Sequence, residues 1–193
     1  TQKISRDAAC ATLGITDLPH TLTIGSIGEL HKNKGFEYLI SAVTKLSPQI
    51  KIRLIIIGDG ERRDALDTLI RNYSLTNQVH LVGSKLDAAS LLSAFDMYVL
   101  PSIKEGLPYV LLEAGSVGIP LISTDVGGVR EIIDDMKNGM LIKPKNAEEI
   151  AQAITYLYEH AENRSRFGHA ISKKITEEFS IEKMRKETYR LYR

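Results

Sequence analysis

The chain has 193 residues, 43% of them hydrophobic and 25% charged, so it is long enough to bury a substantial core within one globular domain. Its 25 basic and 24 acidic residues leave a net charge of +1, which excludes the surplus of Lys and Arg typical of a nucleic-acid-binding protein. A balanced net charge still permits a local basic patch, so the sequence leaves open whether the full-length protein makes peripheral contact with a membrane.

A single cysteine limits the covalent and metal chemistry of the chain. Cys10 is the only cysteine, which excludes an intrachain disulfide and a thiolate metal cluster. This favours a reducing compartment, so we expect a cytoplasmic protein, with the inner face of the membrane left open as its place of work. The sequence contains no run of about 18 or more apolar residues, so it predicts no membrane-spanning helix. The chain begins with Thr1 rather than Met, and we interpret it as part of a longer protein.

The start of the chain differs in pattern from the rest. A short helical segment over residues 6–13 is followed by Gly14 and Pro19, and we interpret residues 1–20 as a linker from a missing N-terminal domain. From residue 21 onward, short β-branched segments alternate with longer helical patterns. The expected strands are residues 21–27, 51–57, 79–82, 97–100, 120–123 and 140–142, and the expected helices are residues 36–46, 61–73, 88–95, 108–117, 129–134, 147–160 and 164–179.

This alternation over residues 21–179 predicts a Rossmann-like α/β domain. Apolar residues recur on one face of the expected helix 36–46, whereas the strand 51–57 is apolar on both faces, as expected of a strand covered by helices on each side. Such units build a doubly wound parallel sheet with right-handed crossovers, which binds ligands at the carboxyl ends of its strands. Residues 180–193 predict a basic helical tail that packs on the domain, with contact to the missing domain or to a membrane as alternatives.

The segment from Pro101 to Glu113 is the most informative part of the sequence. A strand ends at Pro101, a loop follows, and Pro108 occupies the position where a helix accepts proline as its first residue. Free N–H groups at a helix start attract anions, and Gly106 lets a ligand approach the backbone closely. Glu113 lies in an apolar helix that we expect to be buried, where a carboxylate is costly unless it is paired. Ligand hydroxyls or an internal Lys or Arg could satisfy it, and the residues alone leave both readings open.

The spacing of Glu105 and Glu113 gains meaning from its surroundings. The context Pro-Ser…Glu-Gly-Leu-Pro…Glu-Ala…Gly-Ile-Pro-Leu-Ile…Gly-Gly-Val-Arg-Glu resembles the E-x7-E region of group 1 glycosyltransferases, which are retaining enzymes of family 4 with the GT-B fold. Further landmarks of that family are similar to residues 28–35, Gly58-Asp59-Gly60, Val82-Gly83 and residues 138–142. The resemblance implies that the chain is the C-terminal, nucleotide-sugar-binding half of such an enzyme.

The resemblance also implies a role for each matching residue. Glu105 would contact hydroxyls of the transferred sugar, Lys34 would neutralise the departing diphosphate, and Glu113 would accept hydrogen bonds from the ribose. The other donor-binding positions would border the phosphates, the sugar and the base, namely Gly28, Gly58, Asp59, Val82, Gly83, Gly106, Leu107 and Pro108. No cofactor is expected besides the nucleotide-sugar substrate. No metal site is expected, because the sequence has no His, Asp and Glu cluster with ligand spacing.

The implied reaction is transfer of a sugar from a nucleoside diphosphate sugar to a hydroxyl acceptor, as in polysaccharide biosynthesis, and the isolated domain should bind nucleotide without catalysing transfer. One position departs from the family, which commonly has Arg where this chain has Glu29. A carboxylate cannot bind a diphosphate directly, so that contact is lost or supplied by another residue such as Lys32. Two alternatives remain, namely a GT-B-fold epimerase or hydrolase that needs no acceptor, and a non-catalytic nucleotide-sugar-binding domain, which Glu29 supports.

Overall fold

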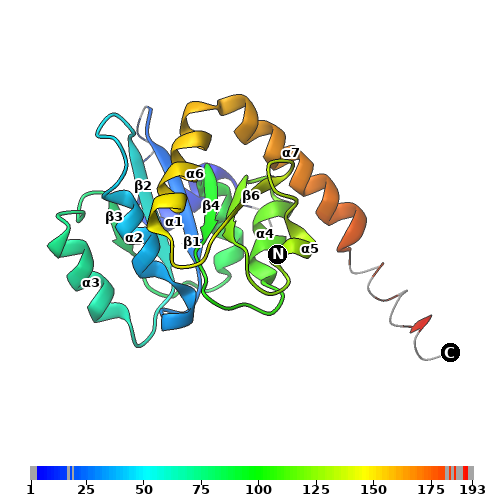
Figure 1. Ribbon diagram of the computed structural model, residues 1–193, viewed down its shortest axis with the longest axis horizontal. Coiled ribbons are helices and arrows are strands. Elements are labelled where there is room, and N and C mark those ends of the chain that lie inside the picture. The colour runs from blue at the N-terminus through cyan, green and yellow to red at the C-terminus, as the bar shows by residue number, and fades with distance from the viewer. Residues whose placement is uncertain are drawn as a thin grey trace.

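A parallel sheet of six strands forms the centre of the computed structural model, which describes residues 4–16, 18, 20–180, 183, 185, 189 and 190 (Figure 1). The strands are β1 (Leu22–Ile27), β2 (Ile52–Ile57), β3 (Val79–Leu81), β4 (Met97–Leu100), β5 (Leu121–Thr124) and β6 (Gly139–Ile142). Their order in the sheet is β3-β2-β1-β4-β5-β6. This is the doubly wound Rossmann-like arrangement that the sequence predicts.

Helices cover both faces of this sheet (Figure 1). One face carries α2 (Phe36–Val43), α3 (Arg63–Asn72) and α6 (Ala147–Glu159), and the other carries α1 (Arg6–Leu13), the 3-10 helix η2 (Ala88–Ala94), α4 (Tyr109–Ser116) and α5 (Val129–Ile132). The last helix, α7 (Ala161–Glu178), packs against both α4 and α6. Alternate residues of one strand serve opposite layers: Leu54 and Ile56 pack on the first face, whereas Ile55 and Ile57 pack on the second.

Every strand and helix expected between residues 21 and 179 is present, with boundaries shifted by a few residues. The expected helix 36–46 ends at Val43, because Thr44, Lys45 and Leu46 donate their N–H groups three residues back and tighten the last turn. The expected helix 88–95 is a 3-10 helix. We expected Pro108 to be the first residue of the helix. Instead the helix begins at Tyr109, and Pro108 is the extended residue before it, with ψ 98°.

The early helix α1 is part of the domain's packing. Ser5 accepts a hydrogen bond from the Ala8 N–H at its start, and Gly14 ends it in the left-handed conformation, φ 67°. Ala9, Cys10 and Leu13 are buried against η2 and the second face of the sheet. The segment interpreted as a linker therefore contributes to the hydrophobic core.

The expected C-terminal tail helix falls mostly outside the described residues, which omit positions 181, 182, 184, 186–188 and 191–193. Positions 1–3, 17 and 19 of the expected linker also lie outside them. Within the described part of the chain, every helix is too short or too polar to cross a lipid bilayer.

Candidate donor site

The strand order reverses between β1 and β4, and the loops that follow these two strands meet directly. β1 pairs with β2 on one side and with β4 on the other. After the strands, the N–H group of Ile103 donates a hydrogen bond to the Asn33 carbonyl oxygen at 2.7 Å. Gly35 has φ 64°, and a Cβ atom there would lie 2.3 Å from the Pro101 carbonyl oxygen. Glycine at this position therefore permits both the left-handed backbone and the close approach of the two loops.

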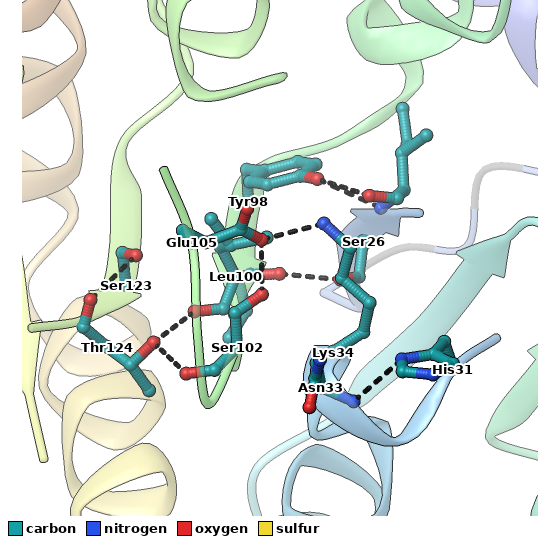
Figure 2. Close-up of polar contacts among 12 residues, drawn as sticks. Ser26, His31, Asn33, Lys34, Tyr98, Leu100, Ser102, Glu105, Ser123 and Thr124 are labelled. Carbon is teal, nitrogen blue, oxygen red and sulfur yellow. Dashed lines mark hydrogen bonds and ion pairs between the residues drawn. The ribbon is translucent and has the colours of Figure 1, made fainter. Parts of the chain in front are cut away.

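This junction brings Lys34 and Glu105 together (Figure 2). Lys34 ends the short 3-10 helix η1 (Lys32–Lys34), and its Nζ lies 2.7 Å from Oε1 of Glu105. The hydroxyl of Ser102 donates to the same carboxylate oxygen, also at 2.7 Å. The side chain of Glu105 is 11% exposed and that of Lys34 27% exposed. The two residues expected to carry the chemistry thus form one hydrogen-bonded group at the switch point of the sheet.

A third loop supports the backbone of this group. A Cβ atom on Gly127, whose φ is 53°, would lie 2.1 Å from the Glu105 carbonyl oxygen. The N–H group of Gly128 donates to the Gly106 carbonyl oxygen at 2.7 Å. By contrast, a Cβ atom on Gly106 would meet nothing within 4 Å, so this side of the loop is open to a ligand. The loop is therefore held in place by Gly127 and Gly128 on one side and is accessible to a ligand at Gly106.

The predicted base-binding turns lie beside the loop that follows β1. A Cβ atom on Gly58 would lie 1.9 Å from the Gly28 carbonyl oxygen, and the Gly58 N–H donates to the Gly83 carbonyl at 3.0 Å. The carbonyl of Asp59 accepts a hydrogen bond from the Leu30 N–H at 2.9 Å. Val82 precedes Gly83 directly after β3. Three of the predicted turns therefore meet at the carboxyl edge of the sheet.

The start of α4 has the features of an anion site. No side chain caps it, so N–H groups of its first turn are left for another acceptor. Pro108 is buried at the cap position, whereas Leu107 just before it is 37% exposed. Glu105 and Gly106 lie in the loop that leads into this helix, so the start of α4 and the Lys34–Glu105 group lie at the same edge of the sheet.

Glu113 differs from the sequence-based expectation. We expected it to be buried, but it is exposed on the surface of α4, because the buried stripe of this short helix falls on Leu111, Ala114 and Gly115. The structure shows no hydrogen bond or ion pair on its carboxylate among the described residues, so the internal Lys or Arg partner considered above is excluded within them. Although the residue as a whole is exposed, partial desolvation of its carboxylate by neighbouring groups raises the pKa of Glu113, and repulsion from Asp87 raises it further.

Glu113 also lies apart from the Lys34–Glu105 group. It lines a cavity of about 730 Å³ together with residues of η2 and α4 such as Ser90 and Ser116, and this cavity includes neither Lys34 nor Glu105. The structure thus brings together two of the three residues with predicted roles, and leaves Glu113 on the neighbouring surface.

Sequence reasoning missed the buried polar residues beneath the site. Burial raises the pKa of the Tyr98 phenol far above its ordinary value, and the nearby carboxylates of Glu113 and Glu105 add to this, so the phenol stays protonated. Its hydroxyl accepts from the Ile27 N–H at 2.9 Å and donates to the Ile27 carbonyl at 3.1 Å. Thr124, at the end of β5, donates to the Ser102 carbonyl at 2.5 Å. Of these residues only Thr124 carries a sequence signal, as a polar residue at the end of an otherwise apolar strand.

The substituted position Glu29 is exposed in the loop after β1, and Lys32, proposed above as a replacement, is exposed as well. His31, between them, accepts a hydrogen bond from the Asn33 N–H through Nδ1 at 3.2 Å, which fixes its ring beside η1. The described residues bring together no group of three or more His, Cys, Asp or Glu side chains that could hold a metal ion.

Comparison with known proteins places this fold and loop arrangement in one family. The family model described as glycosyl transferases group 1 matches residues 19–174. The alpha-D-kanosaminyltransferase of Streptomyces kanamyceticus is 34% identical over 156 residues, which cover 79% of this chain and 40% of that protein. The lipopolysaccharide core biosynthesis glycosyltransferase LpsE of Rhizobium meliloti is 32% identical over 157 residues, which cover 81% of this chain and 45% of that protein. The chain thus spans less than half the length of these relatives.

Solved structures agree with this assignment. The C-terminal domain of a group 1 glycosyl transferase (LpcC) from Francisella tularensis superposes with a TM-score of 0.80 at 26% identity, covering 92% of this chain and 94% of that one. HepE of Anabaena, solved in complex with UDP-glucose, shares the fold with a TM-score of 0.89 at 23% identity, covering all of this chain and 53% of that one. The chain therefore belongs to the group 1 glycosyltransferases, and its fold is that of a Rossmann-like domain of a GT-B enzyme.

Proposed function

We propose that this chain is the donor-binding half of a retaining glycosyltransferase, which transfers a sugar from a nucleoside diphosphate sugar to a hydroxyl acceptor. The observation that carries the proposal is the contact between Lys34 and Glu105 at the reversal of strand order, in the loop that leads to the uncapped start of α4. A cation and free backbone donors suit a diphosphate, and a carboxylate suits sugar hydroxyls. All three features lie at one edge of the sheet.

The proposed catalytic work is electrostatic. As the bond between sugar and diphosphate breaks, negative charge grows on the leaving phosphate. The Lys34 ammonium and the N–H groups at the start of α4 would stabilise that charge, as preorganised donors do in other enzymes. Glu105 would hold the sugar by accepting hydrogen bonds from its hydroxyls, without forming a covalent bond to it.

The nucleoside would lie along the turns that follow β2 and β3. The base would border the backbone of Val82 and Gly83, with Gly58 and Asp59 beside it. The ribose would donate to Glu113, whose carboxylate has no other partner among the described residues. HepE, which shares this fold, is solved with UDP-glucose and with UDP, which supports a nucleotide ligand for this chain.

The acceptor and the closed active site would come from a second, N-terminal Rossmann-like domain. The chain covers only 40–45% of the two relatives described above, which supports a partner half in the complete protein. The chain alone would then bind the donor but not catalyse transfer. The name of one relative, a lipopolysaccharide core biosynthesis glycosyltransferase, supports a role in polysaccharide biosynthesis.

Calorimetry of this chain with UDP, GDP and ADP tests the proposal. We expect one of the three to bind at millimolar concentration or below, and its identity names the base. Glu113→Ala should weaken binding of that diphosphate, whereas Glu105→Ala should weaken chiefly the sugar-bearing donor. Absence of binding by all three nucleotides, or unchanged affinities in both variants, would contradict the proposed site.

A further inference from the structure

One oxygen of Glu105 accepts hydrogen bonds from two donors. Oε1 accepts hydrogen bonds from the Lys34 ammonium and from the Ser102 hydroxyl, each at 2.7 Å (Figure 2). With only 11% of its side chain exposed, the carboxylate depends on these partners rather than on water. If the ammonium leaves, another donor has to replace it, or the enclosed charge becomes costly.

Of the two charged residues, Glu105 is the fixed one. The carbonyl of Ser102, which lies in the same loop, accepts from the buried Thr124 hydroxyl at 2.5 Å. The backbone of Glu105 itself packs against Gly127, where even a Cβ atom would not fit. Ser102 is fully buried, so its hydroxyl stays on the carboxylate whatever Lys34 does.

Lys34 is the movable one. Its side chain is more exposed, at 27%, and consists of a flexible four-carbon stem with a compact charge at its end. The stem passes over Gly28, where a Cβ atom would lie 3.6 Å from the Lys34 Cδ and Cε atoms. This is an ordinary van der Waals distance, so the stem is in contact with the Gly28 backbone without being wedged against it.

We propose that Lys34 and Glu105 form an exchangeable pair, in which sugar hydroxyls replace the ammonium on Glu105 and thereby release it for the diphosphate. A bare nucleoside diphosphate brings no hydroxyl to Glu105, so it has to compete with the carboxylate for Lys34. The pair would therefore favour a sugar-bearing nucleotide over its product diphosphate. This proposal rests on the proposed function, since it requires a donor bound at this site.

The test is the affinity of the bare diphosphate, which does not depend on knowing the sugar. Calorimetry with UDP, GDP and ADP is carried out on the wild type, Glu105→Gln, Lys34→Met and the double variant. Glu105→Gln frees the ammonium, and we expect it to tighten binding of the preferred diphosphate by about threefold or more. In the Lys34→Met background the same substitution should bring no gain, because no ammonium remains to be released.

A matched control removes a carboxylate from another Lys–Glu pair. Nζ of Lys45, just after the end of α2, lies 3.3 Å from Oε2 of Glu148 in the first turn of α6, and Glu148→Gln should leave diphosphate affinity unchanged. An equal gain from Glu105→Gln with and without Lys34 would mean simple repulsion between carboxylate and phosphate, and would overturn the exchange. Wild-type binding without a gain in Glu105→Gln would also overturn it, while leaving the proposed function in place. No binding by any variant would overturn both.

Discussion

The hydroxyl of Tyr98 provides a sharp test of how the sheet is held at the site. It makes two hydrogen bonds to the backbone of Ile27, the last residue of β1, and it is fully buried. Tyr98→Phe removes both bonds, fills nearly the same volume, and leaves the Ile27 N–H without its acceptor. Two lost hydrogen bonds at about 1 kcal/mol each, plus the penalty for a half-buried unpaired N–H, predict a loss of about 2–3 kcal/mol in the free energy of unfolding. For a chain of this size, that lowers the midpoint of thermal unfolding by roughly 4–12 °C.

Urea unfolding followed by circular dichroism measures this loss directly. Tyr38→Phe is the matched control, because Tyr38 is half-buried on α2 and its hydroxyl has no hydrogen-bond partner among the described residues. We expect the control to stay within about 0.5 kcal/mol of the wild type. A similarly small loss for Tyr98→Phe, or an equal loss for both variants, would refute the reasoning that the two hydrogen bonds stabilise the end of β1.

Two further predictions concern charges near the site. Glu29→Arg should tighten binding of the preferred nucleoside diphosphate by about tenfold at low salt, because it exchanges a repulsive charge for an attractive one, and the gain should fade as salt is added. Glu178→Arg, at the far end of α7, is the control and should not change the affinity. An equal gain from the control would mean that net charge alone causes the effect. Glu113→Gln should raise the stability of the domain at pH 7: partial burial and Asp87 raise the pKa of Glu113, so the ionised carboxylate opposes folding. Protonation removes that opposition, so the advantage of the variant should shrink as the pH falls through the raised pKa towards pH 4. Urea unfolding at pH 7 and pH 4 measures it, and a variant less stable than the wild type at pH 7 would contradict the argument.

The layered fold could be predicted because periodicity along the chain determines it. Strands such as β2, apolar on both faces, require helices on each side, and the alternation of elements then leaves few topologies. The sequence pattern is less informative where tertiary packing decides. Nothing in the pattern of residues 6–13 indicates that Ala9, Cys10 and Leu13 pack against η2 rather than in a linker. Likewise, the 3-10 geometry of residues 88–94 depends on local hydrogen bonding that periodicity does not encode.

The candidate site was predictable in its chain positions and less so in its contacts. Sequence motifs led us to propose roles for Lys34 and Glu105, but the ion pair that joins them depends on two loops 71 positions apart meeting at the sheet edge. Glu113 was misplaced because its apolar neighbours suggested burial, whereas α4 is short and turns this residue outward. Ser102 and Tyr98 were overlooked because a single polar residue in an apolar strand or loop has no pattern of its own until its backbone partners are known.

The pairing of β1 with β4 has a consequence for how the protein folds during its synthesis. β1 is the first strand of the chain but lies in the middle of the sheet, and its partner on one side is formed by residues such as Met97, opposite Ile24. During synthesis, β1, β2 and β3 emerge long before that partner exists, so an apolar strand edge waits unpaired. Pairing β1 with a strand so far along the chain is slow, and the Lys34–Glu105 contact cannot form before β1 and β4 have paired. We therefore expect nucleotide binding to be acquired late in biogenesis, when most of the chain has left the ribosome, and until then the nascent chain depends on protection from aggregation.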